Sequence, residues 1–377
     1  MSRTTTALLV PELNGKFLLQ QVSLEPLQPG EALVEIHASG VCHTDLNCAL
    51  GRLPCEPNAV LGHEGGGVVV ETGSDVTEAK VGDKVLLSFA HCGACPGCQS
   101  GHPAYCYHFN DRNFGGKRPD GTTALFLGEG NAKKPVHSTF FGQSSFARLA
   151  VVHRSSIVRV PAETPLELFA PLGCGIQTGV GAILNTLKVK QGSSVAVFGV
   201  GSVGLAAVMA AKAAGATTIV AVDLHAERLR LAQELGATHG VIGGSDLDKI
   251  VADIRAVCPR PALGVDFAVD CAGVPIVVET MVAALGMNGR AATVGAPGLG
   301  STAKIDISSH LTYGKEYVGC SEGDSNPPKF IPYLIDMHRQ GKLPLEKIIK
   351  YYDVKDYEAA IHDAHAGRTV KAVLRWN

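Results

Sequence analysis

In the first part of the chain, apolar residues come in short runs that are separated by glycine-rich turns. The segment 31–38 alternates between apolar and polar positions, and the runs at 65–73 and 81–89 lie between turn signals, as strands do. Helical patterns are scarce before about residue 160. The sequence therefore predicts a first domain that is rich in β-structure.

From about Pro161 the pattern changes to buried strands that alternate with helices. The segment 225–236 predicts an amphipathic helix that Gly236 ends, with apolar residues at Leu229, Leu231, Ala232 and Leu235. Strands are expected at 193–199, 217–223, 238–243, 264–273 and 289–297, and helices at 202–215, 225–236, 246–258 and 275–286. Alternation at this spacing predicts an α/β fold, with a parallel sheet covered by helices on both faces.

The end of the chain departs from this alternation. A helix is expected at 327–341 and a final strand at 369–376, and neither extends the series of strands and helices. We expect this closing part to fold back onto the first domain, which would make the first domain discontinuous in sequence.

Composition narrows the class of protein. The chain has 377 residues, of which 46% are hydrophobic and 18% charged, and this indicates a globular protein of two domains. Its formal net charge of −2 does not indicate binding to nucleic acid or to an anionic membrane surface, which a positively charged protein would favour. The apolar run near the N-terminus is too short for a signal peptide.

The most apolar stretch, residues 195–222, is interrupted by Lys212 and by glycines, so a strand, a helix and a second strand explain it better than a membrane span. Eleven cysteines in a chain of this kind favour a reducing compartment, where thiols bind metals rather than form disulfides. We therefore expect a cytoplasmic protein with neither a membrane nor a nucleic-acid partner.

A glycine turn predicts a dinucleotide site. Gly199, Gly201 and Gly204 form G-x-G-x-x-G directly after an expected strand and at the start of an expected helix, which is the context that this motif requires. Asp223 ends the next strand, 19 residues after Gly204, where a carboxylate binds the adenosine ribose and repels a 2′-phosphate. This favours NAD over NADP, although Arg228 is near enough in sequence to pair with a 2′-phosphate.

Four cysteines are clustered in one short segment. Cys92, Cys95, Cys98 and Cys106 are spaced C-x2-C-x2-C-x7-C, which suits a closed tetrahedral zinc site with no position left for substrate. An iron–sulfur cluster is the competing interpretation, but in the bacterial ferredoxin pattern the fourth cysteine comes after three residues and precedes proline, whereas Tyr107 follows here.

A second set of possible ligands is scattered along the chain. Cys42, His63 and Cys174 lie in separate segments, and two thiolates with one imidazole make the ligand set of an open, catalytic zinc. Sequence spacing alone does not join them, because a single buried cysteine is more often a small hydrophobic residue than a ligand.

A family resemblance joins these segments. The stretch GHEGGGVVVETGSDV, from Gly62 to Val76, matches the zinc alcohol dehydrogenase signature, and GVCHTD, the four-cysteine segment and VFGVGSVG follow the family's order. The chain thus resembles the zinc-containing medium-chain alcohol dehydrogenases. The stretches FAHCGACPGCQSGHPAYCYHF and FFGQSSFA are most similar to the aryl-alcohol (benzyl alcohol) branch.

The resemblance implies a GroES-like catalytic domain and a Rossmann domain, with domain ranges 1–178, 179–318 and 319–377, the last completing the first. It implies two zinc ions per chain, one catalytic (Cys42, His63, Cys174) and one structural (Cys92, Cys95, Cys98, Cys106). It also implies the following roles: Asp45 orients His63, Glu64 is a transient or outer ligand, Thr44 takes the alcohol proton, His43 and Lys371 contact cofactor phosphate, and Gly199, Gly201, Gly204, Val203, Asp223 and Arg228 bind NAD.

One position departs from the family pattern. Asn47 occupies the place where liver-type members carry a histidine that ends the proton relay, and an amide does not titrate near neutrality. We expect the proton to reach solvent from Thr44 through the nicotinamide ribose and His43.

The expected activity is hydride transfer between NAD and a primary alcohol or its aldehyde, aromatic or allylic. Phe109, Phe114, Phe140 and Phe141 could line an apolar pocket for such a substrate, although aromatic residues more often belong to the core. A thiol-carrier-dependent formaldehyde dehydrogenase of the same superfamily and a carbonyl reductase of secondary metabolism remain alternatives.

Two other classes of protein agree less well with the sequence. A nucleotide-binding protein without catalysis disagrees with the complete zinc ligand set, and a short-chain reductase would need Tyr351 and Lys355 to lie within the alternating domain. The other cysteines are expected to be free thiols: Cys48, Cys55, Cys258, Cys271 and Cys320. A homodimer or homotetramer is expected, and the segment 302–319 could supply an edge strand for pairing.

Overall fold

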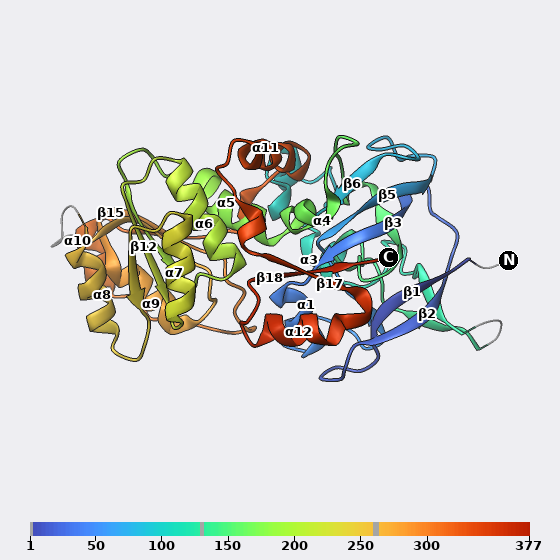
Figure 1. The fold of residues 1–377 in the computed structure, drawn as a ribbon, viewed down its shortest axis with the longest axis horizontal. Coiled ribbons are helices and arrows are strands. Elements are labelled where there is room, and N and C mark those ends of the chain that lie inside the picture. Colours follow the sequence, from blue (N-terminus) through green and yellow to red (C-terminus); the bar gives the residue numbers. More distant parts are fainter. Residues whose placement is uncertain (1–2, 129–131, 259–263) are drawn as a thin grey trace. The chain divides into compact units, whose positions relative to one another are not determined.

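The computed structural model describes residues 3–128, 132–258 and 264–377 (Figure 1), and its contacts divide the chain into two compact units. Unit 1 comprises residues 1–174, 326–335 and 345–377, and unit 2 comprises residues 175–325 and 336–344. The domain ranges 1–178, 179–318 and 319–377, which the sequence analysis gave, stay a prediction.

Unit 1 contains two mainly antiparallel sheets. The first has the strand order β4-β1-β2-β7-β8, made of β1 (Arg3–Val10), β2 (Leu18–Leu24), β4 (Ala59–Val60), β7 (Leu125–Leu127) and β8 (Lys134–Val136). The second has the order β10-β6-β5-β3-β18-β17 with β9 also on β3, made of β3 (Glu31–Gly40), β5 (Gly65–Thr72), β6 (Lys84–Leu87), β9 (Leu149–His153), β10 (Ile157–Arg159), β17 (Ile349–Asp353) and β18 (Lys371–Arg375). The β-rich first domain is thereby confirmed.

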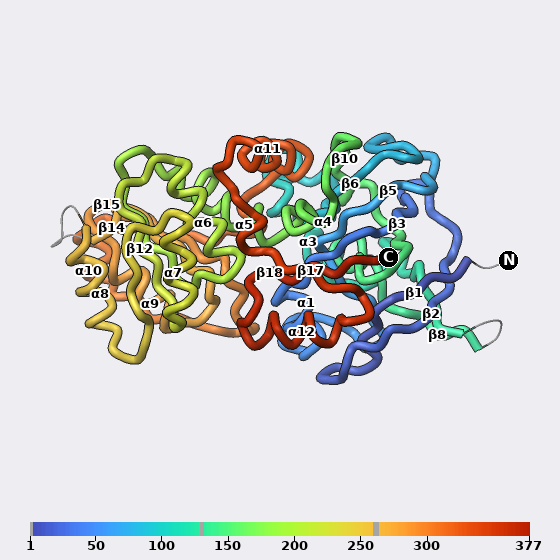
Figure 2. The backbone as a smooth tube through the Cα atoms, viewed as in Figure 1, coloured from blue at the N-terminus to red at the C-terminus, as the bar shows by residue number. Residues whose placement is uncertain are grey.

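The C-terminal segment returns to the first sheet-forming region, as the sequence predicted. Strand β18 pairs antiparallel with β3, and Val373 lies opposite Gly40. Figure 2 shows this last, red strand running along the blue one. The short helices of unit 1 are α1 (His43–Ala49), α2 (Pro96–Gln99), α3 (Phe109–Phe114), α4 (Leu166–Phe169) and α12 (Tyr357–His365).

Unit 2 is built on a parallel sheet with the order β13-β12-β11-β14-β15-β16. Its strands are β11 (Ser194–Phe198), β12 (Thr218–Asp223), β13 (His239–Ile242), β14 (Val265–Asp270), β15 (Leu285–Thr293) and β16 (Glu316–Gly319). Its helices are α5 (Gly175–Gly181), α6 (Ser202–Ala213), α7 (Ala226–Leu235), α8 (Leu247–Ala256), α9 (Pro275–Ala284) and α10 (Ile307–Tyr313); α11 (Pro327–Arg339) has residues in both units.

The apolar pattern explains this sheet. All five residues of β11 are buried, because the strand lies in the middle of the sheet and carries helices on it, such as α6 and α9. The α/β fold is thus confirmed. The segment 302–319 supplies an edge strand, as the sequence allowed: β16 lies at the edge of the sheet, and helix α10 precedes it in the same segment.

The apolar stretch 195–222 forms β11, α6 and β12, as expected. Within the described ranges, no single helix is long and apolar enough to cross a membrane; one bent pair, Leu166–Gly173 with Gly175–Thr186, meets the length and composition criteria together. Tyr351 and Lys355 belong to unit 1, outside the parallel sheet, which disagrees with a short-chain reductase.

Candidate metal centres and cofactor site

Unit 1 brings together three residues that are far apart in the sequence. The ligand atoms of Cys42, His63 and Cys174 all lie within 4.8 Å of one another. Cys42 caps the N-terminus of α1, His63 lies in the turn before β5, and Cys174 follows a short 3-10 turn. Their side-chain chemistry, two thiols and one imidazole, is that of a zinc site with an open fourth position.

The orientation of His63 fits a metal ligand. Its Nδ1 is 2.9 Å from Oδ1 of Asp45, and both side chains are fully buried. Among the described residues its Nε2 has no hydrogen-bond partner, although this nitrogen is buried too. Because Nδ1–H donates to the carboxylate, the lone pair of Nε2 is directed to the place where Cys42 and Cys174 meet.

Asp45 also fixes the two ligand segments. Its Oδ1 accepts from the backbone N–H of Gly62 at 3.0 Å, and its Oδ2 accepts from the backbone N–H of Cys42 at 3.0 Å. One buried carboxylate therefore holds the imidazole and the backbone on either side of the site.

The thiol of Cys42 has an environment that favours its anion. A hydrogen bond from Cys174 lowers the pKa of Cys42 most, the nearby His63 lowers it further, and burial opposes both effects, so that the pKa falls well below its ordinary value. A thiolate is the form of cysteine that binds a metal.

Glu64 and Lys371 form a buried ion pair beside this site. Nζ of Lys371 lies 2.9 Å from both carboxylate oxygens of Glu64 and 3.3 Å from the carbonyl oxygen of Val41, and Lys371 is 1% exposed. Burial lowers the pKa of Lys371, but Glu64 and the Cys42 thiolate outweigh burial and raise it. The role of Lys371 as a phosphate contact stays a prediction, and within unit 1 its ammonium group is already bound to Glu64.

The expected relay residues lie on α1. Thr44 is partly buried, with Oγ1 3.8 Å from Sγ of Cys42, whereas His43 is exposed. Asn47 is partly buried, and its backbone oxygen accepts from Arg52 at 2.8 Å. The structure thus brings Thr44, and not only the three ligands, to the metal site.

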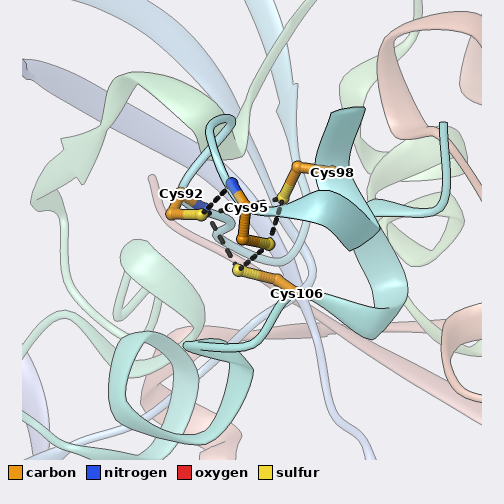
Figure 3. A group of neighbouring side chains, drawn as sticks. All are labelled: Cys92, Cys95, Cys98 and Cys106. Atoms are coloured by element: carbon orange, nitrogen blue, oxygen red, sulfur yellow. Dashed lines mark hydrogen bonds between the residues drawn. The ribbon is translucent and has the colours of Figure 1, made fainter. Parts of the chain in front are cut away.

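The four-cysteine segment folds into a closed group (Figure 3). Its sulfur atoms lie 3.6 Å (Cys95 to Cys98) and 3.9 Å (Cys92 to Cys98, Cys95 to Cys106) apart. A tetrahedron with Zn–S bonds of about 2.3 Å has S–S edges of about 3.8 Å, whereas a disulfide needs about 2.05 Å. The spacing therefore fits four ligands of one zinc ion.

Backbone N–H groups point at these sulfur atoms, as expected for thiolates. Sγ of Cys106 accepts from Cys92 N at 3.3 Å, Sγ of Cys92 from Cys95 N at 3.3 Å, and Sγ of Cys95 from Tyr107 N at 3.4 Å. The hydrogen bonds from Tyr107 and Cys98 lower the pKa of Cys95 to about 6. This backbone cage compensates part of the negative charge that four thiolates bring together.

The glycine turn in unit 2 has the form that the motif predicted. Gly199 has φ +82° at the end of β11, and a Cβ on Gly204 would lie 2.0 Å from the carbonyl oxygen of Gly199, so only glycine permits this approach of helix to strand. Val203 lies between them in the first turn of α6. The N-terminus of α6 is therefore placed for a pyrophosphate.

Asp223 ends β12 beside this turn. Its Oδ2 accepts from the backbone N–H of Val200 at 2.9 Å, and its Oδ1 accepts from that of His225 at 3.0 Å. Nη1 of Arg228 is 3.6 Å from the place of a Cβ on Gly201. The structure thus brings both the carboxylate and the guanidinium to the dinucleotide turn.

A cluster of four packed phenylalanine rings, two of which contact the His63 imidazole, forms what we call the aromatic wall: Phe109, Phe114, Phe140 and Phe141. The Phe141 ring stacks on His63 with centroids 4.5 Å apart, and the Phe140 ring meets it edge-on at 5.5 Å. The Phe114 ring contacts those of Phe140 and Phe141, with centroids 5.8 and 5.2 Å apart. The sequence analysis proposed these four phenylalanines as pocket residues, but the sequence does not show that their rings pack together beside a zinc ligand.

Comparison with known proteins agrees with this fold and these sites. The family "Alcohol dehydrogenase GroES-like domain" matches residues 28–162, and "Zinc-binding dehydrogenase" matches residues 202–337. Geraniol dehydrogenase of Castellaniella defragrans is 38% identical over 369 residues, which cover 98% of this chain and 96% of the relative. S-(hydroxymethyl)glutathione dehydrogenase of Synechocystis is 33% identical and covers 97% of this chain and 98% of the relative.

Two solved structures match along the whole of both chains. The alcohol dehydrogenase zinc-binding domain protein from Burkholderia ambifaria has a TM-score of 0.94 at 43% identity, and benzyl alcohol dehydrogenase from Acinetobacter calcoaceticus has 0.93 at 41%. Fold and site together define a metal-dependent dehydrogenase that uses a nicotinamide dinucleotide. The chain belongs to the zinc-containing medium-chain alcohol dehydrogenases, and its predicted cofactors, zinc and NAD, are confirmed.

Proposed function

We propose that this enzyme interconverts an aromatic or allylic primary alcohol and its aldehyde, at a catalytic zinc held by Cys42, His63 and Cys174. One arrangement carries the proposal: the buried, unpartnered Nε2 of His63 faces two thiols, while the aromatic wall packs on the same imidazole. An apolar surface beside an open metal position suits a substrate with a π-system next to its hydroxyl. The names of the relatives, geraniol and benzyl alcohol dehydrogenase, support this substrate class.

The protein's own residues have distinct tasks in this reaction. Bound zinc supplies a Lewis acid that lowers the pKa of the alcohol, and bound NAD accepts the hydride. Asp45 holds His63 in the tautomer with a free Nε2, and the Thr44 hydroxyl, close to Cys42, receives the alcohol proton. The aromatic wall excludes water and aligns the substrate carbon.

The proton then has to leave Thr44 without a titratable group at position 47. We propose that the exposed His43, which precedes Thr44 on α1, delivers it to solvent, and the ribose hydroxyls of bound NAD would supply the link between these two side chains. Imidazole titrates close to neutral pH, which an amide does not do.

Asn47→His is expected to raise kcat at low pH if this proton transfer limits turnover. The new imidazole adds an acceptor one helical turn from His43, on the same helix. The pH dependence of kcat, measured for the wild type and the variant, checks this expectation, with Asn47→Gln as the control that keeps an amide. A pH profile that is the same in all three proteins would contradict it.

A screen of NAD-linked oxidation tests the proposed substrate class. Benzyl and allylic alcohols should give higher kcat/KM than long-chain alcohols and glycols, without any added thiol. The relatives named S-(hydroxymethyl)glutathione dehydrogenase favour the second candidate, thiol-dependent formaldehyde oxidation. Activity that appears only with formaldehyde and a carrier thiol would establish that candidate and overturn the first.

The choice between NAD and NADP is assigned to Asp223. Asp223→Asn removes the negative charge and keeps an oxygen for Val200 N, so the ratio of kcat/KM for NAD to that for NADP should fall by about tenfold or more, since about 1.4 kcal/mol of lost repulsion is a factor of ten. Steady-state kinetics with both cofactors measures this ratio. Arg228→Gln is the matched control and should lower only the use of NADP; an unchanged ratio in Asp223→Asn would refute the assignment.

We also propose a homodimer or homotetramer, located in the cytoplasm. Among the described residues, β16 pairs with β15 on one side alone, and three apolar side chains in the preceding part of the chain are strongly exposed: Leu299 (81%), Ile307 (81%) and Leu311 (82%). Pairing of two sheet edges would satisfy the strand and cover apolar surface. Sedimentation analysis of the purified protein gives the mass of the assembly, and a monomer would contradict this proposal.

A further inference from the structure

Gln143 lies fully buried between the backbone segments that carry the proposed zinc ligands. Its Nε2 donates to the carbonyl oxygen of His63 and to that of Ser88, each at 3.0 Å, and its Oε1 accepts from the backbone N–H of Gly65 at 3.1 Å. The two N–H groups of the side-chain amide donate to two carbonyl groups, and its oxygen accepts from an N–H. Only one orientation of the amide therefore satisfies all three hydrogen bonds. The side chain thereby bridges the His63 turn and the end of β6.

Ser88 continues this connection to a second ligand. Its hydroxyl donates to the carbonyl oxygen of Gly173 at 2.7 Å, and Gly173 precedes Cys174 in the chain. A Cβ on Gly173 would lie 2.1 Å from the carbonyl oxygen of Leu87, so the backbone before Cys174 presses closely on the end of β6. A continuous set of hydrogen bonds therefore runs from His63 through Gln143 and Ser88 to the neighbour of Cys174.

The loop that presents Gln143 has a constrained backbone. Thr139, Phe141 and Ser144 have φ of +66°, +50° and +45°, a conformation that non-glycine residues rarely adopt. The Ser144 hydroxyl donates to the carbonyl oxygen of Val60 at 2.6 Å and accepts from Phe140 N at 3.0 Å. These bonds offset the backbone strain and fix the loop along the segment that leads to His63.

We propose that Gln143 is a positioning residue of the catalytic metal site, which holds the backbone of His63 directly and that of Cys174 through Ser88. It touches neither metal nor substrate in this role. It sets the separation of the ligand segments, and the same loop places the Phe141 ring on the His63 imidazole. Partners behind the ligands of a zinc site usually contribute about 10- to 100-fold to metal affinity. The inference rests on the proposed function of this site.

Metal affinity tests the inference independently of turnover. Cobalt(II) is exchanged for zinc, the absorption bands that are missing in Cys174→Ser identify the catalytic site, and competition with a chelator gives its affinity. Gln143→Met, similar in size but unable to make the three bonds, should weaken metal binding at this site by about 10- to 100-fold and alter its absorption bands. The metal of the four-cysteine segment should be retained.

Asn113→Leu is the matched control. Asn113 is also a fully buried amide, whose Oδ1 accepts from Ala90 N at 2.8 Å and whose Nδ2 donates to the carbonyl oxygens of Ala90 and Phe109 at 3.0 and 2.8 Å. None of these partners is a proposed catalytic ligand or its neighbour in the chain. The control variant should lose thermal stability as Gln143→Met does, with the metal affinity of the catalytic site unchanged.

The outcomes separate the inference from the proposed function. Gln143→Met with wild-type affinity and bands would overturn the inference alone, and so would an equal loss of affinity in Asn113→Leu. A wild-type chain that binds only one metal ion would overturn the proposed function as well. If Gln143→Met does not fold, Ser88→Ala decides the question, since it removes one hydroxyl and should weaken the catalytic site in the same direction but less.

Discussion

Cys174→Ser is expected to leave one zinc ion per chain instead of two and to lower kcat/KM by about 1,000-fold or more. The hydroxyl has almost the volume of the thiol but is a far weaker zinc ligand, so the site loses one of its three ligands. A bound metal contributes several kcal/mol to the stabilisation of the transition state, and about 4 kcal/mol is a factor of about 1,000. Zinc analysis and steady-state oxidation of the best alcohol substrate measure both effects.

The thermal midpoint of Cys174→Ser should change little, because the buried groups around the site keep their hydrogen bonds to Asp45. Cys258→Ser is the control for placing a hydroxyl at a buried cysteine: its Sγ donates to the carbonyl oxygen of Ile254 at 3.2 Å, and a serine can keep that bond. Full activity of Cys174→Ser with two zinc ions would show that Cys174 is not a catalytic ligand.

A cysteine-to-serine change in the four-cysteine segment should lower the stability of the protein first and its activity only as a consequence. Cys95→Ser is expected to lose the other zinc ion and to lower the thermal midpoint by about 10 °C, since the binding free energy of a structural zinc contributes to folding, and about 4 kcal/mol corresponds to roughly this shift. The segment consists of the short helix α2, which has no buried residue, a 3-10 turn and loops, so we expect the zinc ion to hold it together. Activity should fall only as the protein loses structure.

Comparison of the two variants assigns the two metal centres. Thermal scanning and zinc analysis at a temperature well below the midpoint separate lost chemistry from lost stability. If Cys95→Ser were stable, lacked one zinc and had no activity, the catalytic and structural roles would be exchanged.

Much of this organisation could be predicted from the sequence, for reasons that are local. The glycine turn with its strand, helix and terminal Asp223 occupies one continuous stretch, and the four cysteines lie within a few turns of one another. Strands such as β11 can be predicted from a continuous apolar run, because a central strand of a parallel sheet is buried on both faces. The three catalytic ligands could be joined only by resemblance, since their proximity is produced by the sheet of unit 1.

Other parts depend on tertiary contacts that leave no sequence pattern. The positioning role of Gln143 and Ser88 could not be predicted, because in the sequence a glutamine that is buried between two carbonyl groups does not differ from any polar loop residue. Helix α10, which precedes the edge strand β16 in the segment 302–319, also left no apolar pattern: Asp306 accepts from Ser308 N and Ser309 N and so begins the helix. The phosphate contact of Lys371 stays a prediction, whereas its burial beside Glu64 is a property of the folded sheet that the sequence does not show.

The position of β18 also has a consequence for biosynthesis. Strand β18 lies between β3 and β17 and carries the lysine that neutralises Glu64, so the second sheet of unit 1 stays incomplete until residues 371–375 leave the ribosome. The parallel-sheet unit is contained mostly in residues 175–325 and is available earlier. Because domains generally fold as units during synthesis, the nascent chain should complete its cofactor-binding unit before its metal-binding one. A nascent chain that stalls before Lys371 would hold a buried carboxylate without its cation, which makes it a ready substrate for proteases.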